Sequence, residues 1–198
     1  MCFHSQQSKT AQEVQHRFKA KTTQPSLLQP TIYNGFEHPK TPIITHVSSE
    51  EIQFFNWGLI LYWAKDSSIQ KSTLNARVET LHEKPTFMEA MYNRCLVISD
   101  SFFKWQWLDT KGKEKQKFKI TLPEGELFAF VGIWSKWQNP HSGEATYSYA
   151  ILTMQANTLI NKIHNTKQRM PIIIDENAKK NGSTMENYLF KTIVYKLL

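Results

Sequence analysis

The sequence lacks most of the features that point directly to a function. Only two of its 198 residues are cysteine, Cys2 and Cys95, which excludes a disulfide framework of the kind that stabilises small secreted domains. Its seven glycines form no phosphate-binding loop, and the cysteines and seven histidines show no metal-ligand spacing such as C-x2-C or H-x3-H. We therefore expect no cofactor and no metal site.

Long hydrophobic runs are absent as well. No apolar stretch approaches the roughly 18 residues that a membrane helix needs. The first ten residues, MCFHSQQSKT, are too polar for a secretory signal, which also argues against Cys2 as the lipidated cysteine of an exported lipoprotein. These absences predict a cytoplasmic protein with no membrane partner.

What the sequence does contain predicts a folded, basic domain. Apolar residues make up 40% of the chain and aromatic residues 13%, which is enough for a real hydrophobic core. The formal net charge is +7. Because phosphate neutralisation supplies most non-specific affinity for nucleic acid, this charge is compatible with a nucleic-acid partner, although many basic proteins bind none.

The pattern of apolar residues predicts an α+β fold. Strands are expected at 42–47, 53–60, 95–99, 102–108, 116–122, 127–134, 147–153 and 170–174, and short helices at 8–19 (with Ser8 as a cap), 85–94 and 156–163. Residues 20–42 hold four prolines and are expected to be loop or extended chain. Close-spaced strands with few helices favour a strongly bent antiparallel sheet or barrel at the centre, flanked by helices. The tail 175–198 is left unassigned.

The most informative residue is Cys2. Once Met1 is removed, its amine and thiol lie on adjacent carbons, with ordinary pKa values of roughly 8 and about 8.5. The amine can condense with an aldehyde to an imine, and the thiol can then close on the imine carbon to give a thiazolidine. The alternative is that a cysteine at position 2 is an accident of an exposed terminus.

Four segments favour a role for Cys2. They are Met1-Cys2; WGLILYW (57–63) followed by NARVET (75–80); RCLVISDSFFKWQW (94–107); and AILTMQAN (150–157) followed by IHNTKQRMPIII (163–174). In this order and at these spacings they resemble the SRAP family, the SOS response-associated peptidase-like proteins that shield abasic sites in single-stranded DNA. The resemblance runs from Cys2 to about Ile174, within what we expect to be a single domain, 1–198.

The resemblance implies a concrete activity. Family members remove Met1, by self-processing, and the exposed cysteine forms a thiazolidine with the ring-opened aldehyde of an abasic deoxyribose, which gives a covalent protein–DNA crosslink. The implied partner is single-stranded DNA containing abasic sites, and the implied fold is a barrel-like sheet with flanking helices. We expect a monomer that associates with the nucleoid.

The resemblance also assigns roles to individual residues. Asn75 matches the asparagine that orients the N-terminal cysteine, although a turn or cap is the commoner role of asparagine. His164 matches the active-site histidine, whose imidazole suits proton transfer near neutral pH. In this chain four residues separate His164 from Arg169, more than is common in the family.

Five residues are expected at the DNA. Arg77 and Arg169 match positions that contact phosphate around the lesion, where the planar guanidinium suits phosphate oxygens. The alternative for Arg77 is an ion pair with an acid such as Glu79. Trp63 and Trp105 could stack on a base or lie in the core. His4 stands where family members often carry an arginine near the lesion.

The most serious departure from the family is Lys104. The family usually reads G-F-x-E-W where this chain reads SFFKW, and its glutamate assists opening of the sugar ring and the proton transfers at the cysteine. A lysine, with an ordinary pKa near 10.4, is normally protonated, and its charge lowers the pKa of a neighbouring amine. We therefore expect crosslinking that is slower or differently controlled.

Two other functions stay open at this point. A thiol peptidase acting in trans would use Cys2 and His164 as its dyad. A binding-only protein would have lost its chemistry with the substitution at Lys104. Acetylation of the α-amine separates these hypotheses, because it should abolish aldehyde capture, spare simple binding and barely affect a thiol peptidase.

Overall fold

The structure is a computed structural model that describes residues 1–174. The tail 175–198, which the sequence left unassigned, lies outside the described residues. The strands are β1 (His4–Gln7), β2 (Thr31–Asn34), β3 (Lys40–Thr45), β4 (Ser48–Trp57), β5 (Asn75–Arg77), β6 (Arg94–Ser99), β7 (Ser101–Trp107), β8 (Lys115–Thr121), β9 (Phe128–Gln138), β10 (Ala145–Gln155), β11 (Arg169–Pro171) and β12 (Ile173–Ile174).

Helices are few and short. They are α1 (Ala11–Phe18), α2 (Pro85–Met88) and α3 (Thr158–Ile163), with 3₁₀ turns at Pro25–Leu27, Gly35–Glu37, Ser67–Ser72, Val78–Thr80, Ala90–Tyr92 and Pro123–Gly125. Helix α1 begins after Thr10, whose side chain forms a capping box with Glu13, so the expected cap at Ser8 is wrong. Ser8 instead donates hydrogen bonds to Asp100 from its backbone and its hydroxyl. The helix expected over 85–94 is only one α turn followed by a 3₁₀ turn.

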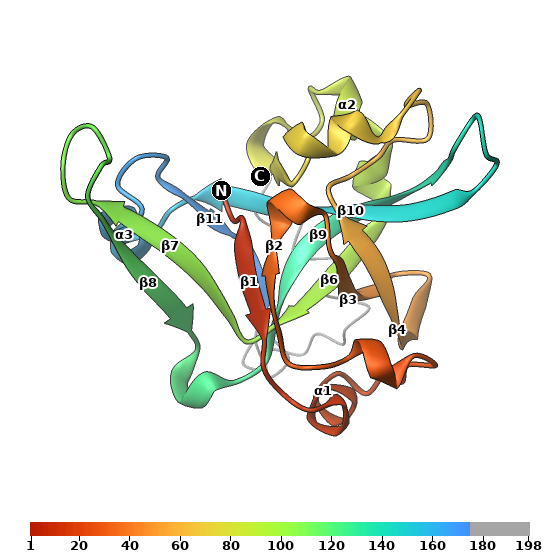
Figure 1. The fold of residues 1–198 in the computed structure, drawn as a ribbon, viewed down its shortest axis with the longest axis horizontal. Helices are drawn as coiled ribbons and strands as arrows, with labels where there is room; N and C mark the ends of the chain where they lie inside the picture. Colours follow the sequence, from red (N-terminus) through yellow and green to blue (C-terminus); the bar gives the residue numbers. More distant parts are fainter. Residues whose placement is uncertain (175–198) are drawn as a thin grey trace.

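The centre of the molecule is a closed barrel of five strands. Neighbouring strands pair in the order β10-β4-β3-β6-β9, and β9 pairs with β10 to close the ring. All of these pairings are antiparallel except β10 with β4, and β5 adds to β10 as a parallel strand outside the ring. Figure 1 shows this barrel to the right of the β7–β8 pair. The expected α+β fold with a bent, barrel-like antiparallel core is confirmed.

Barrel strands β3, β6, β9 and β10 are buried on both faces along much of their length, whereas β4 is only partly buried. One side chain set fills the interior, and a second set packs outward against α1 and against the segment around α2. At one crossing the strands leave no room for a side chain. A Cβ on Gly132 would meet Ala150 O at 2.9 Å and Cys95 Sγ at 3.0 Å.

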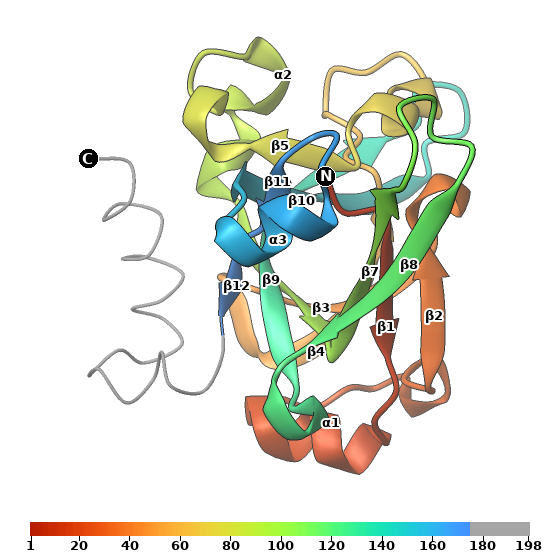
Figure 2. The ribbon, with the colours of Figure 1, turned by 90° about the vertical axis from the view of Figure 1, so that its left-hand side faces the viewer.

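A second sheet packs against the barrel and contains the N-terminal strand. Its four strands lie in the order β2-β1-β7-β8, so β1 is held on both sides. The sequence did not predict strands β1, β2 and β5. Strand β2 lies within residues 20–42, which were expected to be loop or extended chain. The end of β1 that carries Met1 lies beside β11 and α3 (Figures 1 and 2). No helix within residues 1–174 is long and apolar enough to cross a membrane.

Candidate active site around the N-terminus

The first three residues are held in place by backbone contacts. The Gly35 N–H donates to Phe3 O (2.8 Å), directly before the four-residue pairing of β1 with β2. A Cβ on Gly35 would lie 3.2 Å from both Phe3 O and the ring of Trp57, so a larger residue there would require one of these neighbours to shift. The Cys2 side chain consequently lies inside the main core cluster and is fully buried while Met1 is attached.

Asn75 binds both backbone polar groups of Cys2. The Cys2 N–H donates to Asn75 Oδ1 (2.9 Å), and Asn75 Nδ2 donates to Cys2 O (2.8 Å). Asn75 reaches this position because it starts β5, where it pairs with Ile151 of β10. A side-chain amide is the natural group for this task, since it carries an acceptor and a donor at fixed separation. The nitrogen of Cys2 is therefore fixed by a residue 73 positions away in the chain.

Lys104 lies on the other side of the Met1–Cys2 peptide bond. Its side chain extends from β7, is 2% exposed, and donates from Nζ to Met1 O and to Arg169 O, the latter at 3.3 Å. Burial lowers the pKa of Lys104, and the nearby Cys2 sulfur and the chain's N-terminal amine oppose that shift. No carboxylate of residues 1–174 forms an ion pair with this lysine, so its donors are directed at two backbone carbonyls.

His164 is held by the same carbonyl. It caps the C-terminus of α3, and its Nδ1 lies 3.2 Å from Arg169 O. Because a carbonyl oxygen can only accept, this contact places the proton on Nδ1 and leaves Nε2 as an acceptor. Burial, and then the charge of Lys104, lowers the pKa of His164 to about 4. At neutral pH the imidazole is therefore uncharged and can accept a proton on Nε2.

The longer spacing between His164 and Arg169 is taken up by a turn. The Gln168 N–H donates to His164 O (3.1 Å), and Gln168 adopts a left-handed backbone conformation with φ of 52°. The Ala156 N–H then donates to Gln168 O (2.9 Å), which anchors the turn to the end of β10. The extra residues thus loop out while the histidine and the arginine carbonyl stay in contact.

Met1, Lys104 and His164 all border one small cavity. It has a volume of about 90 Å³ and is lined by Met1, Phe3, Phe103, Lys104, Trp105, Trp107, His164 and Thr166. A larger, open groove of about 600 Å³ adjoins it and shares Trp107 and Thr166 with it. Burial, and then the charge of Lys104, lowers the pKa of the Met1 amine to about 4. An amine in this position is uncharged, and hence nucleophilic, at neutral pH.

The two arginines expected at phosphate lie in different environments. Arg77 is exposed at the end of β5. Arg169 is 8% exposed, and its two terminal nitrogens donate to the two carboxylate oxygens of Glu79 (2.8 and 2.7 Å), with a further bond to Thr153 O. The ion pair considered for Arg77 thus belongs to Arg169. The Glu79 carboxylate thus occupies the two terminal N–H groups of Arg169 that a phosphate would need, while the Arg169 carbonyl accepts from Lys104.

The three remaining residues expected at DNA are not all at the cavity. His4 and Trp105 contact each other edge to face (centroids 4.9 Å apart), and Trp105 lines the cavity. Trp63 is half exposed in the loop after β4 and is not among the cavity-lining residues. Sequence reasoning missed Trp107, although the alternation in FFKWQW was a signal that Phe103, Trp105 and Trp107 share one face of a strand.

The two thiols are both protonated where they lie. Burial raises the pKa of the Cys2 thiol, against the opposing charge of Lys104, and burial alone raises the pKa of Cys95. Cys95 faces the barrel interior, in agreement with its expected place as a small core residue. Within residues 1–174, no three His, Cys, Asp or Glu side chains gather in a way that could hold a metal ion.

Comparisons with known proteins place the chain in a family. The family model described as SOS response associated peptidase (SRAP) matches residues 1–189. The chain is 41% identical over 140 residues to the abasic site processing protein YoqW of Bacillus subtilis, covering 70% of this chain and 60% of that protein. It is 29% identical over 174 residues to the abasic site processing protein HMCES of Xenopus tropicalis, covering 72% of this chain and 50% of that one. The chain thus spans about half to 60% of these relatives' length.

Solved structures share the fold. A protein from Bacteroides thetaiotaomicron superposes with a TM-score of 0.84 at 35% identity, covering 100% of this chain and 86% of that chain. A protein from Bordetella bronchiseptica superposes with a TM-score of 0.77 at 21% identity, covering 99% and 91%, which supports the fold alone. Together with the match of the family model over nearly the whole sequence, these comparisons show that the chain belongs to the SOS response associated peptidase (SRAP) family.

Proposed function

We propose that this protein captures abasic sites in single-stranded DNA as a covalent thiazolidine on Cys2, after its own active site has removed Met1. One observation carries the proposal: two side chains are devoted to a single peptide bond. Asn75 holds the nitrogen of Cys2, and Lys104 donates to the carbonyl oxygen of Met1. The names of the relatives from Bacillus and Xenopus, which are abasic site processing proteins, support the lesion as the substrate.

The first step is hydrolysis of the Met1–Cys2 bond. In the tetrahedral intermediate, negative charge develops on the Met1 oxygen, which already accepts a hydrogen bond from Lys104. The departing nitrogen of Cys2 stays bound to Asn75. Water supplies the hydroxyl of the released methionine and a proton for the amine. His164, which is neutral and borders the same cavity, accepts a proton from the attacking water.

The second step uses the same geometry. The carbon that next bonds to the Cys2 nitrogen is the aldehyde carbon of the lesion, so it takes the place of the Met1 carbonyl carbon. Its oxygen then lies at Lys104 and leaves as water when the imine forms. The Cys2 sulfur adds to the imine carbon, its proton passing by way of His164 to the imine nitrogen. In this proposal Lys104 serves as the donor to the oxygen, in place of the family's glutamate.

The DNA-binding roles are narrower than the sequence alone suggested. Arg77 is proposed to contact a phosphate, because it is exposed at the end of the strand that begins with Asn75. His4 and Trp105 are proposed to contact the lesion's neighbours, since both border the N-terminal segment. For Arg169 we propose positioning, since its guanidinium is engaged and its carbonyl binds both Lys104 and His164.

The experiment that tests the proposal is a denaturing gel of the mature protein with single-stranded DNA that holds one abasic site. The matched arms are the Cys2→Ala variant, the α-amine acetylated protein, and a strand of the same sequence without the lesion. The proposal expects a band shift that survives denaturation, requires the lesion, and disappears in both modified proteins.

The other outcomes separate the alternatives. A shift that survives acetylation would refute capture by the amine and favour a reaction of the thiol alone. No covalent shift, with retained binding in a native gel, would favour a binding-only protein. Cleavage of an added peptide that requires Cys2 and His164 but not the free amine would favour a thiol peptidase acting in trans.

A further inference from the structure

The outer face of the β7–β8 pair combines aromatic rings with a row of lysines. In the antiparallel register Trp107 faces Lys115, Trp105 faces Lys117 and Phe103 faces Lys119. Directly opposed residues point to the same side of a sheet, so all six side chains share one face. The three lysines are exposed, the tryptophans half-buried and the phenylalanine buried.

Two of the three lysines, Lys115 and Lys117, lie against aromatic rings of the neighbouring strand. Lys115 Nζ lies 5.3 Å from the Trp107 ring centroid, and Lys117 Nζ lies 4.4 Å from that of Phe103 and 5.7 Å from that of Trp105. Cation–π contacts of this kind draw flexible side chains into one place at little cost, while the ammonium groups remain in water. The face thus presents exposed positive charges beside aromatic rings.

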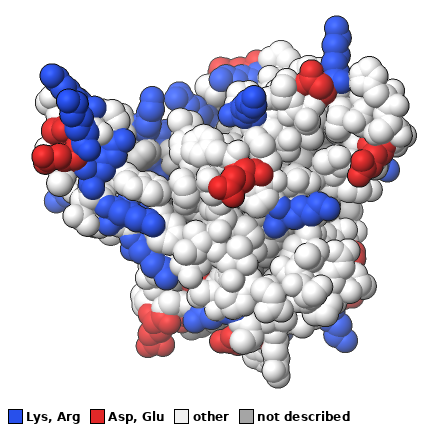
Figure 3. All heavy atoms as spheres, in the orientation of Figure 1, with Lys and Arg blue, Asp and Glu red and all other residues white. Residues whose placement is uncertain are grey.

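The spacing and charge of this face fit a single polynucleotide strand. Residues two apart on a strand are about 6.7 Å apart, twice the rise per residue. This is on the scale of the separation of neighbouring phosphates in a polynucleotide, and the aromatic rings beside the lysines suit the unpaired bases of a single strand. Residues 111–119 hold five lysines and one glutamate. In Figure 3, Lys and Arg side chains gather over the side of the molecule where β7 and β8 lie.

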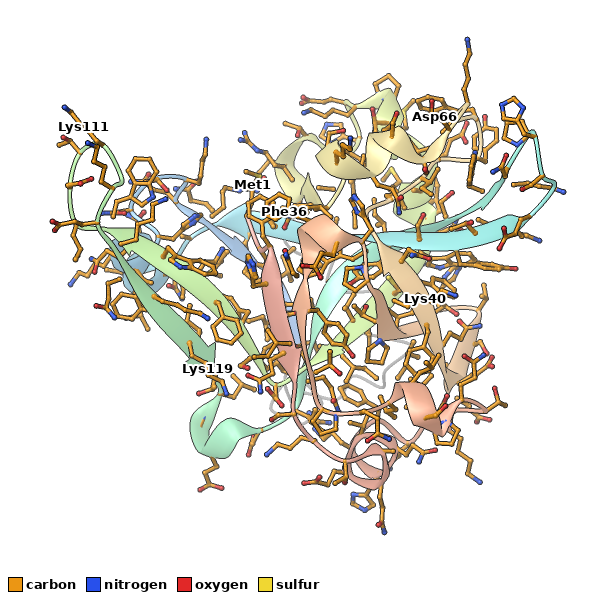
Figure 4. All side chains as sticks on the ribbon, viewed as in Figure 1. Met1, Phe36, Lys40, Asp66, Lys111 and Lys119 are labelled. Atoms are coloured by element: carbon orange, nitrogen blue, oxygen red, sulfur yellow. The ribbon has the colours of Figure 1, made fainter. Side chains whose placement is uncertain are left out.

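The face leads directly to the N-terminal cavity. Trp105 and Trp107 line that cavity, and Trp107 also borders the adjoining groove of about 600 Å³. Figure 4 shows Lys111 at the tip of the β7–β8 hairpin, Lys119 towards the other end of β8, and Met1 beside this strand pair. A strand whose lesion lies at Cys2 can therefore continue across β7 and β8 without leaving the protein surface.

We propose that Trp105, Trp107, Lys115, Lys117 and Lys119 form a platform for single-stranded DNA, which holds the nucleotides flanking the captured lesion. The lysines bind successive phosphates, and the indoles stack on bases exposed between them. The flanking role depends on the proposed function, whereas binding of an intact strand by this face does not. The platform supplies affinity before any covalent bond forms.

The test measures binding of a labelled oligothymidine without any lesion, by fluorescence anisotropy across a series of salt concentrations. In single strands each neutralised phosphate contributes about 0.7 to the slope of log affinity against log salt. The Lys115→Gln/Lys117→Gln/Lys119→Gln variant should therefore lower the magnitude of that slope by about 2. The matched control, Lys21→Gln/Lys40→Gln/Lys136→Gln, removes the same charge from exposed positions elsewhere and should change the slope by well under half as much.

A second variant tests the stacking. Trp107→Leu should weaken binding by about 5-fold or more at constant salt, as expected for the loss of one base stack, and a thermal melt checks that the variant is folded. Equal slopes for the two triple variants, or duplex DNA bound as tightly as the single strand, would overturn the platform. If the wild-type protein fails to capture an abasic strand but the slopes differ as expected, the proposed function fails and the platform stands.

Discussion

Replacing Lys104 by methionine should nearly stop both chemical steps while leaving the fold intact. Methionine is unbranched and of similar length, so it can fill the buried site, but it has no donor for the Met1 oxygen. Of the two carbonyls that Lys104 binds, that of Arg169 keeps its contact with His164, and that of Met1 borders the cavity, where water can replace the lysine. Neither carbonyl is therefore left without a hydrogen-bond donor in the variant.

The expected loss can be derived from the contact itself. A hydrogen bond from a charged donor contributes about 1.5–3 kcal/mol in a ground state. Its contribution grows when the acceptor becomes an oxyanion, and removal of one such donor in other enzymes costs about 100- to 1,000-fold in rate. Because Lys104 is 2% exposed, little water shields its charge in the wild type, and a loss within this range is expected for Met1 removal.

The assay starts from protein that still carries Met1, made by cell-free synthesis without methionine aminopeptidase. Intact mass follows loss of the methionine with time in the wild type, in Lys104→Met and in Lys104→Glu. Lys136→Met serves as the control, since it removes one exposed lysine that does not line the cavity. Lys104→Glu tests whether the family's carboxylate works in this cavity. The introduced carboxyl group would face the carbonyl oxygens of Met1 and Arg169, which should raise its pKa.

The reasoning fails if Lys104→Met loses its methionine as fast as the wild type. In that case the hydrogen bond to the Met1 oxygen would be structural. If the wild type itself keeps Met1 indefinitely, self-processing is refuted whatever Lys104 does. Capture by variants whose Met1 has been removed by added aminopeptidase then isolates the role of Lys104 in the second step.

Three further results are expected. Asn75→Ala should reduce capture by about 10- to 100-fold, because it removes two hydrogen bonds of about 1 kcal/mol each, whereas Asn75→Asp, which keeps the acceptor, should lose less in a quantified gel. Since His164 acts as a base with a pKa of about 4, capture should persist to mildly acidic pH and fall as the pH drops through that value; in Lys104→Met the missing charge should move this limb to higher pH. Arg169→Met should lower the free energy of unfolding by about 1–3 kcal/mol in urea at pH 7. Because Arg169 holds the pKa of Glu79 below its usual value, this difference should shrink as the pH falls through the lowered pKa.

The sequence alone was sufficient to propose a chemistry for the N-terminus and to outline the fold. An amine and a thiol on adjacent carbons are a property of Cys2 alone, whatever surrounds it. The strands of the barrel could be located because apolar, β-branched and aromatic residues dominate them, and a chain with so few helical segments favours a closed sheet. The short strands β1 and β5 could not be located, since a few polar residues carry no period and their pairing depends on distant partners.

Only the tertiary structure decided what each polar side chain binds. Arg77 and Arg169 look alike in the sequence, yet Glu79 pairs with the second, because β11 and the turn after β5 both lie at the end of β10. In the same way the sequence marked Lys104 as a departure without showing that its ammonium group lies on the Met1 oxygen. Local patterns encode secondary structure and burial, whereas a hydrogen bond between residues 103 positions apart exists only once the sheet has brought them together.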